Sequence, residues 1–405
     1  MAARRLAVPL VTAVLILAPG ALAACAPPTQ ATLTLGAALP RSGSLAAEGK
    51  ATEQGYQLCV DTVNAKGGIV LGARTVQLRL SVVDDASKAA NTAKLVDDFN
   101  AQGVKLILGS YGSATTAAEA PVVERNGQLL ADSAGADDAI FAHGYKRTFA
   151  VLSPASQYAS TILLAVAELA SPAPRSVAFL SADDGFSKTS TASGVVAAKA
   201  LGLSVVGSQV FPSGSTDVQA ALAKIQPLKP DLVIGSVHLA EGEAIMKQAG
   251  PAGLTPLGFG ETVAPSTSQF PKQLGATANG VIGSSQWSKT VGGRDDLFGS
   301  APEYDAKVRA TFGTAASYQQ AQASAACLAL VKGLENARTD NPDKVRDALA
   351  ALDMSSFFGP LRFDSTGKNV TKRMVVIQVQ RGVAVTVWPP GAAEAPFVWP
   401  SAPAA

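Results

Sequence analysis

The sequence predicts an α/β protein of two similar lobes, and three observations lead to this prediction. Short apolar runs that suit buried strands alternate with longer segments of helical periodicity, separated by short turns. The apolar runs recur at an offset of roughly 127 residues, far beyond the period of a solenoid repeat: residues 76–83, 105–110 and 128–133 resemble residues 203–210, 231–236 and 255–260. At 405 residues, the chain can also build two separate cores. Successive βα units with short turns favour parallel sheets covered by helices.

The first 24 residues have the features of an export signal. Arg4 and Arg5 precede an apolar run, Leu6–Leu17, that is too short for a membrane span. The segment from Leu22 to Cys25 resembles the lipobox of bacterial lipoproteins, which implies a lipid anchor on Cys25; a soluble export signal cut after Ala23 or Ala24 is the alternative. We therefore expect a signal peptide over 1–24, a tether over 25–31, and an exported protein in the periplasm or on the outer face of the cytoplasmic membrane.

Charge and motif content weigh against nucleic-acid binding and catalysis. With 33 basic and 31 acidic residues, the chain offers no charge argument for binding nucleic acid or an anionic membrane. It contains only two histidines, no His-Glu-x-x-His, no cysteine pair at zinc spacing and no Gly-x-Ser-x-Gly. The first strand is not followed by a Gly-x-Gly-x-x-Gly loop. We expect no enzyme, no cofactor and no metal site.

Two cysteines remain beyond Cys25. Cys59 lies on the apolar face of one expected helix and Cys327 lies in an alanine-rich helix over residues 318–334. Buried free thiols are the prediction, because cysteine is among the most buried residue types. A disulfide is the alternative, since an exported protein meets an oxidising environment.

The stretch Leu106–Thr116 is the strongest local candidate for a binding site. A short apolar strand runs into Gly109 and Gly112 and then into a helix whose first turn carries Ser113 and Thr116. The first N–H groups of a helix lack intrahelical partners and the helix dipole is positive there, so such a point can bind an anion. The alternative is an ordinary capped helix in an α/β domain.

Several segments together resemble the branched-chain amino-acid class of periplasmic substrate-binding proteins, which have the type I fold. The resemblance covers nearly the whole mature chain. The segments that carry it, in chain order, are Gly36–Gly43, Asn64–Gly68, Val83–Asp85, Gly109–Thr116, Phe357–Asp364 and Val379–Pro389.

The resemblance implies a clamp of two Rossmann-like lobes with parallel sheets, joined by three crossovers that permit hinge closure. We expect these crossovers near Val151–Pro154, Ser284–Ser288 and Met354–Gly359. The first lobe would take residues 32–150 and 289–354, and the second would take 151–288 and 355–388. The segment 389–405 is rich in Pro, Ala and Gly and is expected to be a flexible tail.

The resemblance also implies the ligand site. Ser113 and Thr116 match positions that hold a ligand carboxylate, and Ala134 and Gly135 lie in a turn that supplies a carbonyl to an α-ammonium. Ala136 stands where the family has a Thr, so one polar group is missing. Glu261 matches the position that pairs with the α-ammonium; a solvated loop carboxylate is the alternative.

Four aromatic residues complete the expected site, and each has core packing as its alternative. Tyr158 follows the first crossover, and Phe186 replaces a Tyr that is often found at its position. Tyr111 and Trp287 could cover an apolar ligand surface or a cation.

The expected function is capture of a small carboxylate-bearing solute and its delivery to the transmembrane subunits of an ABC permease. A branched-chain or other neutral amino acid is the first ligand hypothesis. Aromatic or aliphatic carboxylic acids and amides are the alternatives, because Ala136 and Phe186 make the site less polar than the family pattern. A sensor that signals to a regulator is a further alternative. We expect a monomer that contacts the membrane only through its lipid anchor.

Overall fold

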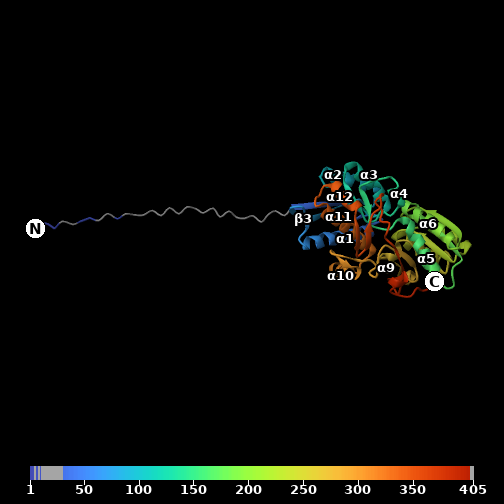
Figure 1. Ribbon diagram of the computed structural model, residues 1–405. Helices are drawn as coiled ribbons and strands as arrows, with labels where there is room; N and C mark the ends of the chain where they lie inside the picture. The colour runs from blue at the N-terminus through green and yellow to red at the C-terminus, as the bar shows by residue number, and fades with distance from the viewer. Residues whose placement is uncertain (4–5, 8–9, 11–30, 402–405) are drawn as a thin grey trace. The chain divides into compact units, whose positions relative to one another are not determined.

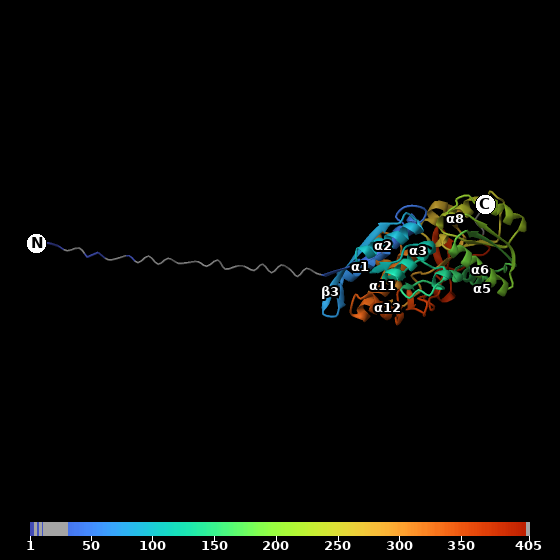
Figure 2. The same ribbon diagram turned by 90° about the horizontal axis from the view of Figure 1, so that it is seen from above.

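The computed structural model describes residues 1–3, 6–7, 10 and 31–401, so the expected lipobox around Cys25 lies outside the described residues. Residues 31–401 form two parallel-dominated sheets with helices packed on them (Figures 1 and 2). The predicted α/β fold class is therefore confirmed. None of the helices in the described part of the chain combines the length and apolar character that a membrane span requires.

The first sheet has the strand order β2-β3-β1-β4-β5-β6, in which β2 is antiparallel to β3 and the other neighbours are parallel. Its strands are β1 (Ala31–Leu39), β2 (Ile69–Leu71), β3 (Arg74–Asp84), β4 (Leu106–Leu108), β5 (Leu129–Asp132) and β6 (Thr148–Ala150). The helices of this lobe are α1 (Ala46–Ala65), α2 (Ala89–Ala101), α3 (Ser113–Asn126), α4 (Asp138–Phe141), α10 (Ala301–Phe312), α11 (Tyr318–Ala337) and α12 (Pro342–Ala350).

The second sheet has the order β17-β16-β11-β10-β9-β7-β8, in which the β11–β16 and β16–β17 pairs are antiparallel and the other neighbours are parallel. Its strands are β7 (Ser176–Ala182), β8 (Ser204–Phe211), β9 (Leu232–Ser236), β10 (Gly258–Glu261), β11 (Ile282–Ser285), β16 (Val375–Gln380) and β17 (Val383–Trp388). Its helices are α5 (Tyr158–Leu169), α6 (Gly185–Ala200), α7 (Gln219–Ile225), α8 (Leu239–Ala249) and α9 (Phe270–Leu274).

The sequence repeat corresponds to a structural repeat. The five parallel strands run β3-β1-β4-β5-β6 in the first sheet and β8-β7-β9-β10-β11 in the second. Each repeated segment falls on an equivalent strand: β3 and β8, β4 and β9, β5 and β10. The carboxyl ends of parallel strands in such open sheets are where ligands bind.

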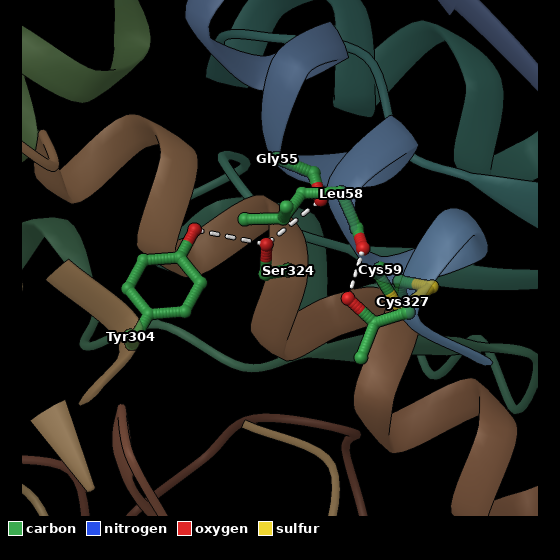
Figure 3. Close-up of a disulfide and its surroundings, with 7 residues drawn as sticks. Gly55, Leu58, Cys59, Tyr304, Ser324 and Cys327 are labelled. Atoms are coloured by element: carbon green, nitrogen blue, oxygen red, sulfur yellow. Dashed lines mark hydrogen bonds between the residues drawn. A yellow bond between two sulfur atoms is a disulfide. The ribbon is translucent and has the colours of Figure 1, made fainter. Parts of the chain in front are cut away.

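A disulfide joins the first lobe's two longest helices, so the prediction of buried free thiols is wrong. Cys59 on α1 and Cys327 on α11 have Cα atoms 6.2 Å apart, which suits a disulfide (Figure 3). The helices approach closely because Gly55 faces α11: a Cβ there would lie 2.3 Å from the Gln320 carbonyl oxygen. Beside the disulfide, Ser324 Oγ donates to the Gly55 carbonyl oxygen and contacts the Tyr304 hydroxyl (Figure 3).

The first crossover leaves the first sheet after β6 at Ala150, and the second leaves the second sheet after β11 at Ser285. The third lies later than expected. Residues 353–362 form a separate hairpin of β14 (Asp353–Ser356) and β15 (Gly359–Arg362), and the chain enters the second sheet only at Val375. The reason is apolar burial: Phe357 and Phe358 are fully buried in the first lobe's core, and Phe357 stacks on Tyr304.

A buried hydrogen-bond cluster ties the three crossovers together. The Gln286 side chain accepts from the Ser153 N–H at 2.9 Å and donates to the Ser153 carbonyl at 3.0 Å. Ser153 Oγ donates to the Lys372 carbonyl at 3.1 Å, and Lys372 Nζ donates to the Gln286 carbonyl. One residue from each crossover therefore takes part.

The expectation of a flexible tail is wrong for residues 389–401. Trp399 packs over Gly258 of β10, and its indole N–H donates to the Pro172 carbonyl at 2.8 Å. Ser401 is buried, and its N–H donates to the Leu257 carbonyl at 2.7 Å. Three aromatic rings in this segment and the strand before it, Trp388, Phe397 and Trp399, pack against the second lobe's core, which supplies the burial that the Pro- and Ala-rich composition concealed.

Candidate ligand site between the lobes

The start of α3 is open toward a cavity. Gly112 precedes the helix with φ 105°, a conformation that favours glycine, and no side chain caps the first turn. Ser113 Oγ accepts from the Asp137 N–H at 3.0 Å, which leaves its own proton for another acceptor. The Thr116 hydroxyl instead turns back into the lobe, toward the Gly112 carbonyl and Asp132. The structure thus places Ser113, and not Thr116, at the cavity surface.

This first cavity has a volume of about 150 Å³ and is lined by both lobes. It contains three of the expected site residues, Tyr111, Ser113 and Phe186. Its full lining is Ser44, Leu45, Ser87, Ala89, Tyr111, Gly112, Ser113, Ala114 and Thr115 from the first lobe and Asp184, Phe186, Ser213, Gly214, His238, Ala240 and Glu241 from the second. Near it the lobes touch directly, since Thr189 Oγ1 of α6 donates to Asp137 at 2.9 Å.

Aromatic rings from both lobes form a continuous arc beside this cavity. Tyr158 meets Phe186 edge-on with centroids 4.9 Å apart, and Phe186 lies 5.1 Å from His238. His238 in turn meets Tyr111 across the lobes at 6.4 Å. Burial raises the pKa of the Tyr111 and Tyr158 hydroxyls above the usual range, so both remain neutral donors.

The turn at Ala134 and Gly135 uses its own polar groups internally. Asp132 Oδ1 accepts from the Ala134 and Gly135 N–H groups at 3.0 and 2.8 Å, and the Ala134 carbonyl accepts from Ala136. A Cβ on Gly135 would lie 2.4 Å from Thr116, so only glycine fits there. Burial raises the pKa of Asp132 to about 6. These residues support the α3 start from behind and are not among the described residues that line the cavity.

Glu261 is buried, so the alternative of a solvated loop carboxylate is wrong. It is 1% exposed and lies beneath α8, where a Cβ on Gly242 would be 2.4 Å from its Oε2. Neither carboxylate oxygen has a hydrogen-bond partner in the described structure. Burial, followed by the nearby charges of Glu241 and Glu243, raises the pKa of Glu261 to about 8. It does not join Ser113 in the first cavity.

Trp287 lies in the first lobe's core and follows its core-packing alternative. Its indole N–H donates to the Phe357 carbonyl at 2.9 Å, and its ring packs edge-on against Tyr304. It is part of the same buried cluster as Phe298 and Phe358. In the sequence Trp287 follows the second crossover and so stands next to a hinge segment. In the structure its side chain contacts residues of the first lobe's core and does not line the cavity.

A second, smaller cavity of about 50 Å³ contains two polar residues that the sequence reasoning missed, Glu48 and Gln319. First-lobe residues Ala47, Ala51 and Ser317 complete one wall, and Leu239, Thr267, Ser268 and Gln269 of the second lobe form the other. Glu48 stands in the first turn of α1, where an acidic residue ordinarily favours the helix dipole. Nothing in the sequence distinguishes that ordinary use from a ligand contact.

Comparisons with known proteins agree with this architecture. The sequence model of the periplasmic binding protein family matches residues 32–384. The chain is similar to the "Leu/Ile/Val-binding protein homolog 8" of Brucella abortus, with 26% identity covering 90% of this chain and 92% of the relative. Homolog 7 of the same species is 24% identical over 92% of this chain and 95% of its own length.

Two solved structures show the same fold. The branched-chain amino acid transporter substrate binding protein LivJ from Streptococcus pneumoniae, in complex with isoleucine, has a TM-score of 0.78 at 24% identity and covers 91% of this chain and 99% of its own. An ABC transporter solute binding protein from R. palustris, in complex with benzoate, has a TM-score of 0.75 at 19% identity and covers 91% and 97%. The match over most of the chain, together with the paired sheets and the cavity between them, shows that this chain belongs to the periplasmic binding protein family.

Proposed function

We propose that the chain is an exported, lipid-anchored solute-binding protein that encloses a small carboxylate-bearing solute by hinge closure and delivers it to an ABC permease. The observation that carries the proposal is the uncapped start of α3, with the Ser113 hydroxyl, opening onto a cavity that both lobes line. Free N–H groups and a positive helix end stabilise a carboxylate, and they do so more strongly as closure removes water. Cys25 would hold the protein at the membrane through its acyl chains.

The first ligand hypothesis is a branched-chain or other neutral amino acid. It is supported by the names of the two Brucella relatives and by the isoleucine bound to the Streptococcus protein. The ammonium of such a ligand needs an acceptor. Glu261 could serve only if its carboxylate reaches the cavity from beneath α8, whereas Asp184 and Glu241 already line the cavity.

An aromatic carboxylic acid is the second hypothesis, and the aromatic arc favours it. Tyr111 and Phe186 line the cavity and Tyr158 packs edge-on against Phe186, and aromatic pairs are stabilised by edge-on and offset contacts. The R. palustris protein, similar in fold, binds benzoate.

A thermal-shift screen of the mature chain from Ala26 onward tests the proposal. The panel would hold neutral and basic amino acids, benzoate and hydroxybenzoates, short-chain acids and the matching amides. A solute present at a hundred times its dissociation constant should stabilise the folded state by about 2.7 kcal/mol. No stabilisation by any solute in the panel would contradict the proposed function.

The variant Ser113→Ala tests where the carboxylate binds. Loss of a hydrogen bond to a charged group is worth about 1.5–3 kcal/mol, so the affinity for every carboxylate ligand should fall roughly ten- to a hundredfold. Thr311→Ala deletes a hydroxyl on the exposed side of α10 and serves as the matched control. Unchanged affinity of Ser113→Ala would place the carboxylate elsewhere.

A further inference from the structure

The second cavity contains buried polar groups without partners, and the two side chains that carry them, Glu48 and Gln319, come from the first lobe. Glu48 is 3% exposed and Gln319 is 2% exposed, yet neither Glu48 oxygen and neither polar atom of the Gln319 amide has a hydrogen-bond partner in the described structure. Leaving a buried polar group unpaired costs about 1–3 kcal/mol, and more for a charged one. A ligand group that enters between the lobes would remove that cost.

The two cavities are neighbours. Ser44 and Leu45 line the first cavity, and Ala47 and Glu48, which follow in the first turn of α1, line the second. On the other side Leu239 lines the second cavity, while the adjacent His238 and Ala240 line the first. A solute whose carboxylate meets Ser113 can therefore extend toward Glu48.

The charge around this path is acidic. Glu48, Asp184 and Glu241 line the two cavities, and no Lys or Arg is among the described lining residues. Burial raises the pKa of the Glu48 carboxyl, and the nearby His238 offsets only part of that rise. A buried carboxylate in such surroundings becomes favourable when a cation pairs with it.

We infer that the site selects solutes that carry, at the end remote from their carboxylate, an ammonium or guanidinium group bound by Glu48 and Gln319. This inference rests on the proposed function and refines its ligand class from neutral to basic amino acids. Glu48 supplies the charge, and the Gln319 amide oxygen supplies a second acceptor.

A competing explanation is that Glu48 acts only as a contact between the lobes. Its carboxylate lies near the start of α8, and it could favour closure without touching a solute. Such a contact would change the affinity of all solutes by one factor, because it acts on the closure equilibrium. A ligand contact would change affinities according to the solute's charge.

Isothermal titration of the mature chain with matched solute pairs tests the inference. Norleucine and ornithine differ only in a terminal methyl and ammonium, and citrulline and arginine differ in the charge of nearly identical end groups. We expect the wild-type protein to bind the charged member of each pair at least tenfold more tightly. In Glu48→Gln this preference should fall below threefold, and Gln319→Met should reduce it in part.

Two controls separate the contributions. Asp61→Asn removes an exposed carboxylate from the same helix and should leave all affinities unchanged. Ser113→Ala should weaken both members of each pair by a similar factor. Melting curves of the Glu48→Gln and Gln319→Met proteins establish that they are folded.

Three results would overturn the inference. They are tighter binding of the neutral member by the wild-type protein, an equal loss for both members in Glu48→Gln, and no binding of any of the four solutes while leucine or benzoate binds. In each of these cases the proposed solute-binding function stands. If no small solute of any class binds, the proposed function falls together with the inference.

Discussion

Replacing Glu261 by Gln should make the folded protein less sensitive to pH. The Glu261 carboxyl is buried without a partner, and its pKa is raised from an ordinary 4.5 to about 8. Between these two values the folded chain holds a proton that the unfolded chain has lost. The wild-type protein therefore loses stability as pH rises, at about 1.4 kcal/mol per pH unit from this one group.

The expected difference follows from this slope. Glu261→Gln keeps the size of the side chain and remains neutral, so near pH 5 the two proteins should have similar free energies of unfolding. By pH 7 the variant should be more stable than the wild type by about 2–3 kcal/mol. Other buried acids, such as Glu119 and Asp132, titrate in both proteins and cancel in the difference.

Urea unfolding of the mature chain at pH 5, 6, 7 and 8 measures this difference. The exposed Asp61→Asn exchange on α1 is the matched control and should show no pH-dependent gain. A difference between Glu261→Gln and wild type that stays constant across these pH values would refute the reasoning. Such a result would mean that the Glu261 carboxylate is already ionised at neutral pH. Contact with a ligand ammonium or with solvent would have that effect.

Two further predictions concern the disulfide and the hinge. Cys59→Ala/Cys327→Ala removes a link between residues 268 positions apart and should lower the free energy of unfolding by about 2–5 kcal/mol, measured by urea unfolding, while ligand affinity stays unchanged; an unchanged unfolding midpoint would contradict a formed disulfide. Burial lowers the pKa of Lys372 to about 7, so between pH 7 and 10 the unfolded chain binds more protons and the wild type gains stability with rising pH. Lys372→Met should reduce the rise of the unfolding free energy with pH by about 1.4 kcal/mol per pH unit. An unfolding free energy that rises equally with pH in both proteins would refute this prediction.

The fold class could be predicted from the sequence because the apolar runs that form strands are local patterns and occur twice in the chain. The runs at 105–110 and 231–236 form the equivalent strands β4 and β9. A short continuous apolar run suits a strand that helices cover on both faces, because every side chain is then buried. The start of α3 was visible for the same reason: Gly112 and Ser113 stand next to each other in the chain.

The departures arose where burial depends on distant partners. The segment around Phe357 joined the first lobe's core because Tyr304 and Phe298 lie there to receive it. Trp399 packs on Gly258, a contact that the Pro- and Ala-rich composition near the C-terminus does not predict. The thiols of Cys59 and Cys327 pair because Gly55 lets α1 lie close against α11.

The sequence by itself therefore determined the α/β class and the internal repeat, and it pointed to the start of α3 as a candidate anion site, because these features depend on residues close together along the chain. Only the tertiary structure decided which polar groups share the space between the lobes. It brought Glu48 and Gln319 to one cavity and placed Glu261 beneath α8. The physical reason is that the energy of a buried carboxyl depends on the neighbours that remove its water, and those neighbours come from other parts of the chain.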